Sequence, residues 1–494
     1  MLVLAVQALV GSLIFWALWN LYKSRSANSS LNNIPGPPPK SIWTGSFGDF
    51  YNIDGWAYHD SIAKAYGGVI KIKSLIGEQH IFEESPAVIM SHNLIFGQGL
   101  LGTLVLTFYD VSYKLRDAIE SEVKNGPQIT RRSTLTPKQL VPSMFKLNML
   151  SAYVLLPLSK VGSPKFRRWM VDTVPYKNLH AVRDIVDVIY NTSIEIFEAK
   201  KAALNNGDEA LAKQVGRGKD IMSILMRANM AASKEDSLTR EELLGQMSTL
   251  IFAAMDTTSS ALSRILYLLS HNQVVQDKLR EEITEAREGG GDLSYDDLVS
   301  LPYLDAICRE TLRLHPPVPM VNRTYVVFFT LYSAGRSHFW ITYVSTQADT
   351  VLPLSTPIRD VEGREIWELA IPKGTLVNLG IMAANRNLEI WGPDANEWKP
   401  ERWINPLPDS VVTAHLPGIY SHLLTFLAGG RACIGFKFAQ LEMKAVLMLL
   451  IESFRFHPTE DKIFWQMAGV TTPVVIGSRN KAPQLPLLVE KVVR

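Results

Sequence analysis

The sequence has few of the residues on which several common classes of protein depend. Only two of its 494 residues are cysteines, Cys308 and Cys433. Two thiols exclude a disulfide scaffold and a four-cysteine zinc site, and they suit a reducing, cytosolic setting. Lys and Arg (50) nearly balance Asp and Glu (48), whereas a nucleic-acid-binding protein usually has a basic excess or a basic block. The chain also lacks a GxSxG nucleophile elbow and a GxxxxGK[ST] phosphate loop.

One long hydrophobic run lies at the N-terminus, and no later run is long and apolar enough to span a membrane. Residues 2–19 contain only three positions that are not hydrophobic, and as a helix they would extend about 27 Å, close to a bilayer core. Lys23 and Arg25 follow this run, so the positive-inside rule places the rest of the chain in the cytosol. We predict a transmembrane anchor over 1–22 and a basic, proline-rich linker over 23–40. The alternative, a cleaved signal peptide, would prefer basic residues before the run.

The rest of the chain, 41–494, has the hydrophobic periodicity of a mainly helical protein. Thr239 and Glu242 form a Thr-x-x-Glu capping box, and Leu243 begins an apolar stripe at helical spacing. Short strands separated by turns are expected from 350 to 379. Further helices are expected over 273–288, over 304–314 and after Cys433. The predicted fold class is mainly α with small β-sheets.

The helix that begins after Thr239 has small residues on the face next to its apolar stripe. These are Thr249, Ala253, Thr257 and Ser260. A face of small residues allows a flat or bulky group to approach the backbone. Close packing against another helix explains the same pattern equally well.

Residues 97–102 match the glycine-rich pattern GxGxxG. Such a pattern indicates dinucleotide binding only where it joins a strand to a helix within a βαβ unit. No repeated βαβ pattern follows it. We therefore do not predict dinucleotide binding here.

Residues 426–435, Phe-Leu-Ala-Gly-Gly-Arg-Ala-Cys-Ile-Gly, place Cys433 in a glycine-rich loop at a predicted helix start. The helix N-terminus and Arg431 both favour the thiolate form of the cysteine. The glycines let the backbone pass close to a large flat ligand, and a thiolate is a soft ligand suited to haem iron. Two alternatives remain: a buried structural cysteine, and a cysteine nucleophile for which no histidine is convincingly placed.

This loop resembles the haem-binding signature of the cytochrome P-450 family, FxxGxRxCxG. Its five fixed positions are matched by Phe426, Gly429, Arg431, Cys433 and Gly435. The resemblance implies that Cys433 is the axial ligand of the iron of haem b and that the other four residues belong to the cofactor-binding loop. It also implies a cytochrome P-450-like fold, one large catalytic domain over 41–494 after the N-terminal anchor.

Two further motifs are similar to the family's ExxR and PERF segments, in the family's order. They are Glu310-x-x-Arg313 and Pro400-Glu401-Arg402-Trp403. The resemblance implies that Arg402 joins Glu310 and Arg313 in a buried triad that holds the haem-binding core. Without the resemblance, an i,i+3 pair of opposite charges is more often a weak surface pair.

Residues 253–258 resemble the family's [AG]GxDT[TS] motif in the long helix over the haem. The resemblance implies that Asp256 and Thr257 are catalytic and relay protons to oxygen at the haem. The acid is then the proton source, and the hydroxyl positions water. Ala254 stands where the family usually has glycine, which narrows the space for oxygen.

The resemblance is thin over 41–215 and is interrupted at 325–343. The basic helix that grips a haem propionate in the family is not recognisable. The strand that begins at Val69 is followed almost at once by 81–84, where a second strand and a helix are expected. One explanation is a mis-predicted gene product with skipped exons and a retained intron, and the other is divergence with altered haem contacts. In both cases Arg431 and Arg323 remain as propionate partners.

The resemblance is closest to fungal microsomal members, and it implies a monooxygenase that inserts one atom of O₂ into an apolar organic substrate, as in secondary metabolism. Electrons would come from a separate NADPH-dependent flavoprotein reductase, and Lys437 is a candidate contact for it. We expect a single-pass protein of the endoplasmic reticulum membrane with a cytosolic catalytic domain and no nucleic-acid partner. The alternative is a haem-deficient, non-catalytic relative tethered to the membrane. Candidate pocket residues are Thr249, Ala253, Val318, Met320 and Met467.

Overall fold

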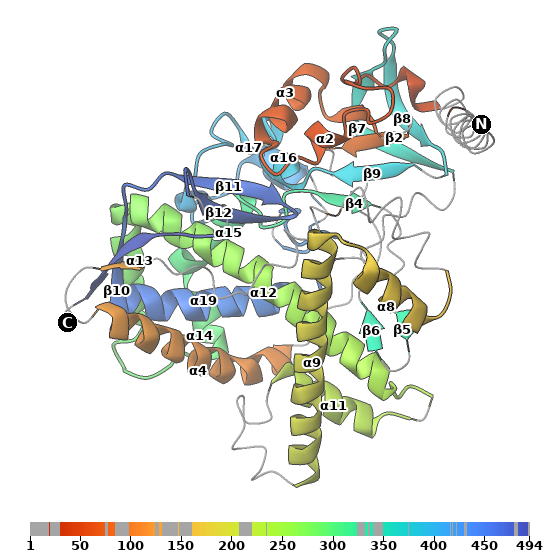
Figure 1. Ribbon diagram of the computed structural model, residues 1–494. Coiled ribbons are helices and arrows are strands. Elements are labelled where there is room, and N and C mark those ends of the chain that lie inside the picture. Colours follow the sequence, from red (N-terminus) through yellow and green to blue (C-terminus); the bar gives the residue numbers. More distant parts are fainter. Residues whose placement is uncertain are drawn as a thin grey trace. The chain divides into compact units, whose positions relative to one another are not determined.

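The protein is described by a computed structural model, and its described part divides into two compact units (Figure 1). One unit is formed by residues 1–90, 319–327 and 341–384, and the other by 91–318, 328–340 and 385–494. The structure describes residues 19, 30–74, 78–83, 98–123, 128–130, 147, 161–206, 220–233, 235–323, 331–333, 336–338, 349–373, 375–414, 416, 418–420, 422–428, 432–478 and 483–492.

The first unit contains a four-stranded sheet in the order β1-β2-β9-β4. Its strands are β1 (Val69–Lys73), β2 (Gln79–Glu83), β9 (Leu376–Leu379) and β4 (Val321–Arg323). Strands β1 and β2 are antiparallel, with Lys71 opposite Ile81, so the segment after β1 is itself the second strand of a hairpin. The remaining elements are η1 (Ser30–Asn33), α2 (Phe47–Phe50), α3 (Trp56–Tyr66), β7 (Thr350–Arg359), β8 (Glu365–Ile371) and α16 (Ile381–Asn385), whose last residue belongs to the second unit. The strands predicted over 350–379 are confirmed.

The second unit is mainly helical. Its long helices are α4 (Gln98–Val123), α8 (Pro164–Thr173), α9 (Lys177–Asn205), α11 (Ile221–Ala231), α12 (Arg240–His271), α13 (Gln273–Ala286), α15 (Pro302–Leu314) and α19 (Phe436–Ser453). Its short helices are α14 (Tyr295–Ser300), α17 (Leu388–Trp391), η5 (Pro400–Trp403) and α18 (Asp409–Thr413). Its strands are β3 (Gln128–Thr130), β5 (Leu331–Ser333), β6 (Arg336–His338), β10 (Phe454–Pro458), β11 (Ile463–Ala468), β12 (Val470–Val475) and β13 (Leu487–Lys491). The predicted mainly α fold with small sheets is therefore observed.

Helix α12 begins where the capping box predicts. The Thr239 hydroxyl accepts a hydrogen bond from the Glu242 amide at 3.3 Å, and the Thr239 amide donates to the Glu242 carboxylate at 2.8 Å. Leu243 and Met247 are buried, as the apolar stripe predicts. These reciprocal bonds satisfy donors that the first turn of a helix leaves free, so this end of α12 is set by its local sequence.

Helix α19 is the centre of the second unit. It packs against α4, α12, α13, α14 and α15, and α4 and α12 run beside it in Figure 1. Eleven of its 18 residues are buried, which explains why its sequence is apolar on nearly every side.

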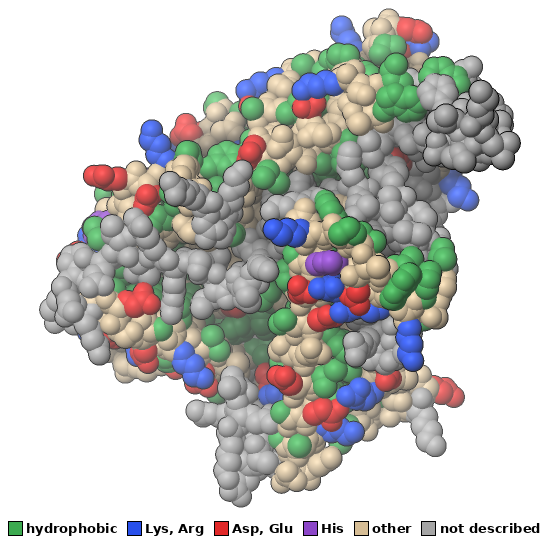
Figure 2. Space-filling model, viewed as in Figure 1, with side chains coloured by type: hydrophobic (Ala, Val, Ile, Leu, Met, Phe, Trp, Pro, Cys, Tyr) green, Lys and Arg blue, Asp and Glu red, His purple; other side chains and the backbone are tan. Residues whose placement is uncertain are grey.

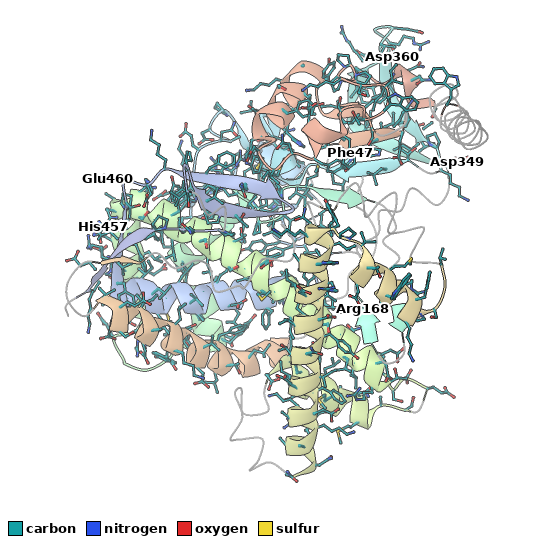
Figure 3. All side chains as sticks on the ribbon, in the orientation of Figure 1. Phe47, Arg168, Asp349, Asp360, His457 and Glu460 are labelled. Atoms are coloured by element: carbon teal, nitrogen blue, oxygen red, sulfur yellow. The ribbon has the colours of Figure 1, made fainter. Side chains whose placement is uncertain are left out.

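An ion pair joins helices α8 and α9. The Arg168 guanidinium, labelled in Figure 3, binds both carboxylate oxygens of Asp187 at 2.8 Å.

Three features predicted from the sequence fall wholly or partly outside the described residues. The predicted anchor over 1–22 is described only at Trp19, and no helix among the described residues is long and apolar enough to cross a membrane. Within 325–343 the structure describes only the short antiparallel strands β5 and β6. The GxGxxG residues 98–102 form the first turns of α4.

Charged side chains of both signs are mixed over the visible surface, in line with the small net charge (Figure 2).

The three charged residues Glu310, Arg313 and Arg402 meet inside the second unit. The Arg313 guanidinium donates to both Glu310 oxygens, at 2.9 and 2.8 Å, and neither side chain is exposed. Arg402 lies 3.5 Å from the same carboxylate and also donates to Asp394 at 3.1 Å. The sequence analysis missed Trp403, whose indole donates to Glu310 at 2.9 Å.

Arg313 also ties α15 to the chain beyond it. Its Nη1 donates to the carbonyl oxygens of Ala395 at 2.7 Å and Asn385 at 3.0 Å. The buried carboxylate and guanidinium are thus neutralised and hydrogen-bonded on every side that the structure describes. A buried pair of this kind is expensive to break, because removing one partner leaves the other charge uncompensated.

We predict that Glu310→Gln lowers the free energy of unfolding by about 3–5 kcal/mol, because Arg313 would stay buried without its carboxylate. Urea unfolding followed by circular dichroism measures the change. Lys64→Ala is the matched control, since it breaks an exposed pair with Asp60 at 2.9 Å and should cost at most about 1 kcal/mol. A loss for Glu310→Gln as small as that of the control would contradict a stabilising role for the triad.

Candidate functional site

The site is built around the loop that precedes α19. The Cys433 amide donates to the Phe426 carbonyl at 2.8 Å, which closes the loop. Leu427 has a φ of +58°, a left-handed conformation that a residue with a side chain adopts only when its surroundings fix it. The Phe426 ring is buried, with ring centroids of Tyr420 and Phe436 at 5.4 and 6.1 Å. Gly429 and Arg431, two of the predicted loop residues, lie outside the described residues.

The Cys433 side chain is exposed, although the helix that follows it is largely buried. A Cβ built on Gly435 would lie 3.9 Å from the sulfur, so the glycine keeps that side of the thiol open. The protein packed around the thiol raises its pKa, and a hydrogen bond from the Gly435 amide offsets this only in part. The sequence predicted surroundings that favour the thiolate of Cys433. The described groups around it instead favour the neutral thiol. A positively charged metal ion would supply the missing stabilisation, because a coordinated thiol loses its proton.

These features fit haem. Cys433 offers one accessible soft sulfur, which would hold the haem iron. Gly435 leaves out the side-chain carbon that would contact the sulfur. Of the predicted propionate partners, Arg323 lies in β4 opposite Val377, and its side chain is outside the described residues, as is Arg431.

Helix α12 has one open face that carries two of the predicted residues. Ala253 is exposed, and the Thr257 hydroxyl donates back to the Ala253 carbonyl at 2.8 Å. Its oxygen remains able to accept a further hydrogen bond. The Asp256 side chain is buried, with 3% of its surface exposed. Asp256 and Thr257 are adjacent in α12, but the Asp256 carboxyl is buried and the Thr257 hydroxyl lies on the open face.

Ser260 does not belong to this open face, although the sequence analysis grouped it there. It is buried and donates to the Thr471 carbonyl of β12 at 2.6 Å. For this residue the alternative of close packing against another element is correct. The face of small residues thus ends near Thr257, where β12 begins to cover α12.

The remaining predicted pocket residues are distributed over both units. Met320 packs against the core of the first unit. In the second unit, Val318 is half-buried, Met467 is buried in β11, and the Thr249 hydroxyl donates to the Gly245 carbonyl at 2.8 Å. Lys437, the candidate reductase contact, lies 5.9 Å from the centre of the Phe436 ring.

Comparison with known proteins agrees with this geometry. The cytochrome P-450 family model matches residues 148–327 and 349–475. Cytochrome P-450 monooxygenase 91 of Postia placenta is 42% identical over 552 aligned positions, which cover 97% of each chain. Monooxygenase 212 of the same fungus is 39% identical, and a ganoderic acid synthetase of Ganoderma lucidum is 36% identical, each over 96% of both chains.

These similarities cover almost the whole chain at high identity. Proteins of this family carry haem b and use O₂, an organic substrate and electrons from a redox partner. The names of the relatives do not favour the haem-deficient alternative. The chain belongs to the cytochrome P-450 family of haem-dependent monooxygenases.

Proposed function

We propose that this monooxygenase oxidises an apolar organic substrate, with Cys433 as the axial ligand of its haem iron. The observation that carries the proposal is the exposed thiol of Cys433 at the head of an otherwise buried helix. A small hydrophobic residue in the same turn would normally be buried. Exposure of the Cys433 sulfur leaves it accessible to a bound ligand such as haem.

The reaction consumes two electrons and two protons, because one oxygen atom enters the substrate and the other leaves as water. When bound, haem supplies the iron centre at which O₂ is activated. The protons have to come from the protein and its solvent. The buried Asp256 carboxyl can hold a proton, and the Thr257 hydroxyl can hold a water molecule on the open face of α12.

The electrons are proposed to come from an NADPH-dependent flavoprotein reductase. The alignment with monooxygenase 91 covers 97% of the chain, and proteins of this family use electrons from a redox partner, which is proposed to be a separate protein. Lys437 beside the cysteine loop is a candidate for its contact surface. A compact acidic patch on a reductase would be attracted to such a lysine.

The protein is proposed to be held on the endoplasmic reticulum membrane by the apolar run at 2–19, with the catalytic domain in the cytosol. The apolar composition of that run and the basic residues after it support this assignment. A membrane location also suits an apolar substrate, which concentrates in the bilayer. Ganoderic acid and its precursors are reasonable first compounds to test, since one relative is named for that product.

We propose that the printed sequence differs from the sequence of the functional protein in two places. The alignment to monooxygenase 91 runs over 552 positions, more than the 494 residues of the chain, so the relative carries residues that this chain lacks. The family model also leaves 328–348 unmatched, close to the segment 325–343 that has no family counterpart in sequence. Both observations support skipped exons and a retained intron, and genuine divergence is the alternative.

We predict that Cys433→Ala abolishes the red-shifted Soret band of the reduced protein exposed to carbon monoxide, because haem would lose its thiolate ligand. The absorption spectrum of the purified full chain measures it. Cys308→Ala is the matched control, since this cysteine is buried in the core and its variant should keep the band. A wild-type chain without the band would instead favour the haem-deficient alternative.

We predict that Thr257→Val reduces product formed per electron consumed by about tenfold or more, because proton delivery at a fixed position contributes about 10²–10⁴ in rate. Product and NADPH consumption are measured together in the reconstituted system. Ser259→Ala is the control, since this hydroxyl makes the same back-bond, to Met255 at 2.8 Å. Equal coupling in both variants would remove Thr257 from the proton path.

We predict that the transcript lacks the codons for 325–343 and contains additional codons within 41–215. Sequencing of full-length messages measures this directly. Expression of the repaired chain should then increase the haem content per molecule relative to the written one. A message that encodes the junctions as written would establish divergence instead.

A further inference from the structure

A series of contacts joins the cysteine loop to Trp403 in the second unit. The Cys433 amide donates to the Phe426 carbonyl at 2.8 Å, and the centre of the Phe426 ring lies 5.4 Å from that of Tyr420. The Arg309 guanidinium carbon lies 5.2 Å from the ring centre of Tyr420 and 5.6 Å from that of Trp403. The Phe426 and Tyr420 rings are buried, whereas Trp403 is partly exposed. The series therefore leads from the cysteine loop toward solvent.

Trp403 is the residue of this series that is best placed to lose an electron. An indole ring is oxidised more readily than a phenyl ring, and Trp403 stands where the family's PERF segment has phenylalanine. The Trp403 indole N–H donates to the Glu310 carboxylate at 2.9 Å. Loss of an electron leaves a positive charge on the indole, and an adjacent carboxylate stabilises that charge.

The charge of Arg309 acts in the opposite direction, because a cation disfavours a second positive charge beside it. Arg309 is itself paired with Asp305, one turn earlier on α15. Its guanidinium carbon lies 5.6 Å from the Trp403 ring centre, whereas the Glu310 oxygen lies 2.9 Å from the indole nitrogen. Since the energy between charges falls with distance, the carboxylate has the stronger influence on the indole.

Two neighbouring aromatic residues are poorer sites for an oxidised ring. An oxidised tyrosine releases its phenol proton, and among the described residues no carboxylate accepts a hydrogen bond from the buried Tyr420 hydroxyl. The buried Trp391 ring lies 5.7 Å from that of Trp403, but the Arg313 guanidinium carbon lies 5.0 Å from the Trp391 ring centre. No described residue accepts a hydrogen bond from the Trp391 indole. Tyr420 and Phe426 therefore serve as a bridge, and the positive charge comes to rest on Trp403.

We propose that Trp403 is an electron donor that protects the cysteine loop and its haem from oxidation when no substrate is bound. The proposal rests on the haem-dependent activity proposed above. The oxidant is hydrogen peroxide, which takes up two electrons and two protons and leaves as two molecules of water. Each electron passes from the Trp403 indole through the Tyr420 and Phe426 rings, and the indole N–H loses its proton. A soluble reductant such as ascorbate returns an electron and a proton to the indole radical, so Trp403 acts twice for each peroxide.

The electron route is tested first on the full chain without haem. Cys433 is exposed and Cys308 is buried, so a thiol-reactive ruthenium photo-oxidant attaches at Cys433. After a light flash, the ruthenium loses an electron to a soluble acceptor and then takes one from the protein. Transient absorption should show a tryptophan radical, which Trp403→Phe should remove. Trp398→Phe is the matched control, since this partly exposed indole donates to the Thr311 hydroxyl at 3.0 Å, and it should keep the signal.

Two variants of Tyr420 distinguish a bridge from a donor. Tyr420→Phe keeps the ring and should leave the yield and the rate of the tryptophan radical unchanged, whereas Tyr420→Leu removes the ring and should slow its formation. Trp403 stays in place in both, so this result does not depend on whether Trp403→Phe folds. An equal radical yield in the wild type and Trp403→Phe would overturn the proposal. A tyrosine radical that Tyr420→Phe removes would also overturn it.

The protective role is measured on the haem-loaded chain with hydrogen peroxide and ascorbate, without substrate. Electron paramagnetic resonance should detect a tryptophan radical, and mass spectrometry should locate oxidation products at Trp403. Trp403→Phe should lose the radical and should lose its haem absorbance faster than the wild type, whereas Trp398→Phe should not. Equal rates of haem loss would overturn the protective role. If the chain binds no haem, the oxygenase proposal and the protective role both fail, and the photochemical result shows separately whether Trp403 donates electrons.

Discussion

The buried ion pair between Glu310 and Arg313 is the constraint on which the arrangement of the second unit depends. The two charges, fully buried and 2.8 Å apart, have to be neutralised and hydrogen-bonded, and their partners come from distant parts of the chain. Arg402, Trp403 and the carbonyl oxygen of Ala395 all converge on this pair. Because burying an unmatched charge is so costly, these segments have little freedom to take other positions.

The cysteine loop uses a different kind of constraint. A backbone hydrogen bond from Cys433 to Phe426 and the left-handed turn at Leu427 fix its path, and the buried Phe426 ring anchors it to the core. The thiol itself is left exposed, and the surrounding protein does not stabilise its charged form. The protein thus fixes the position of the sulfur, and in the proposed haem complex the positive charge of the iron would stabilise the thiolate.

Helices α12 and α19 bring the residues proposed for proton delivery and for haem binding into one unit. Helix α19 follows the thiol, α12 carries Asp256 and Thr257, and the two helices pack directly on one another.

The sequence by itself determined the features that depend on neighbouring residues: the capping box at Thr239, the i,i+3 spacing of Glu310 and Arg313, and the ten-residue loop around Cys433. In each of these, the partners lie within one or two turns of the chain, so their spacing already implies their contact. Only the tertiary structure decided that Trp403 donates to Glu310 and that Ser260 is buried and donates to the Thr471 carbonyl. These contacts join segments far apart in the chain, and they arise from how whole helices and strands pack, which local spacing does not encode.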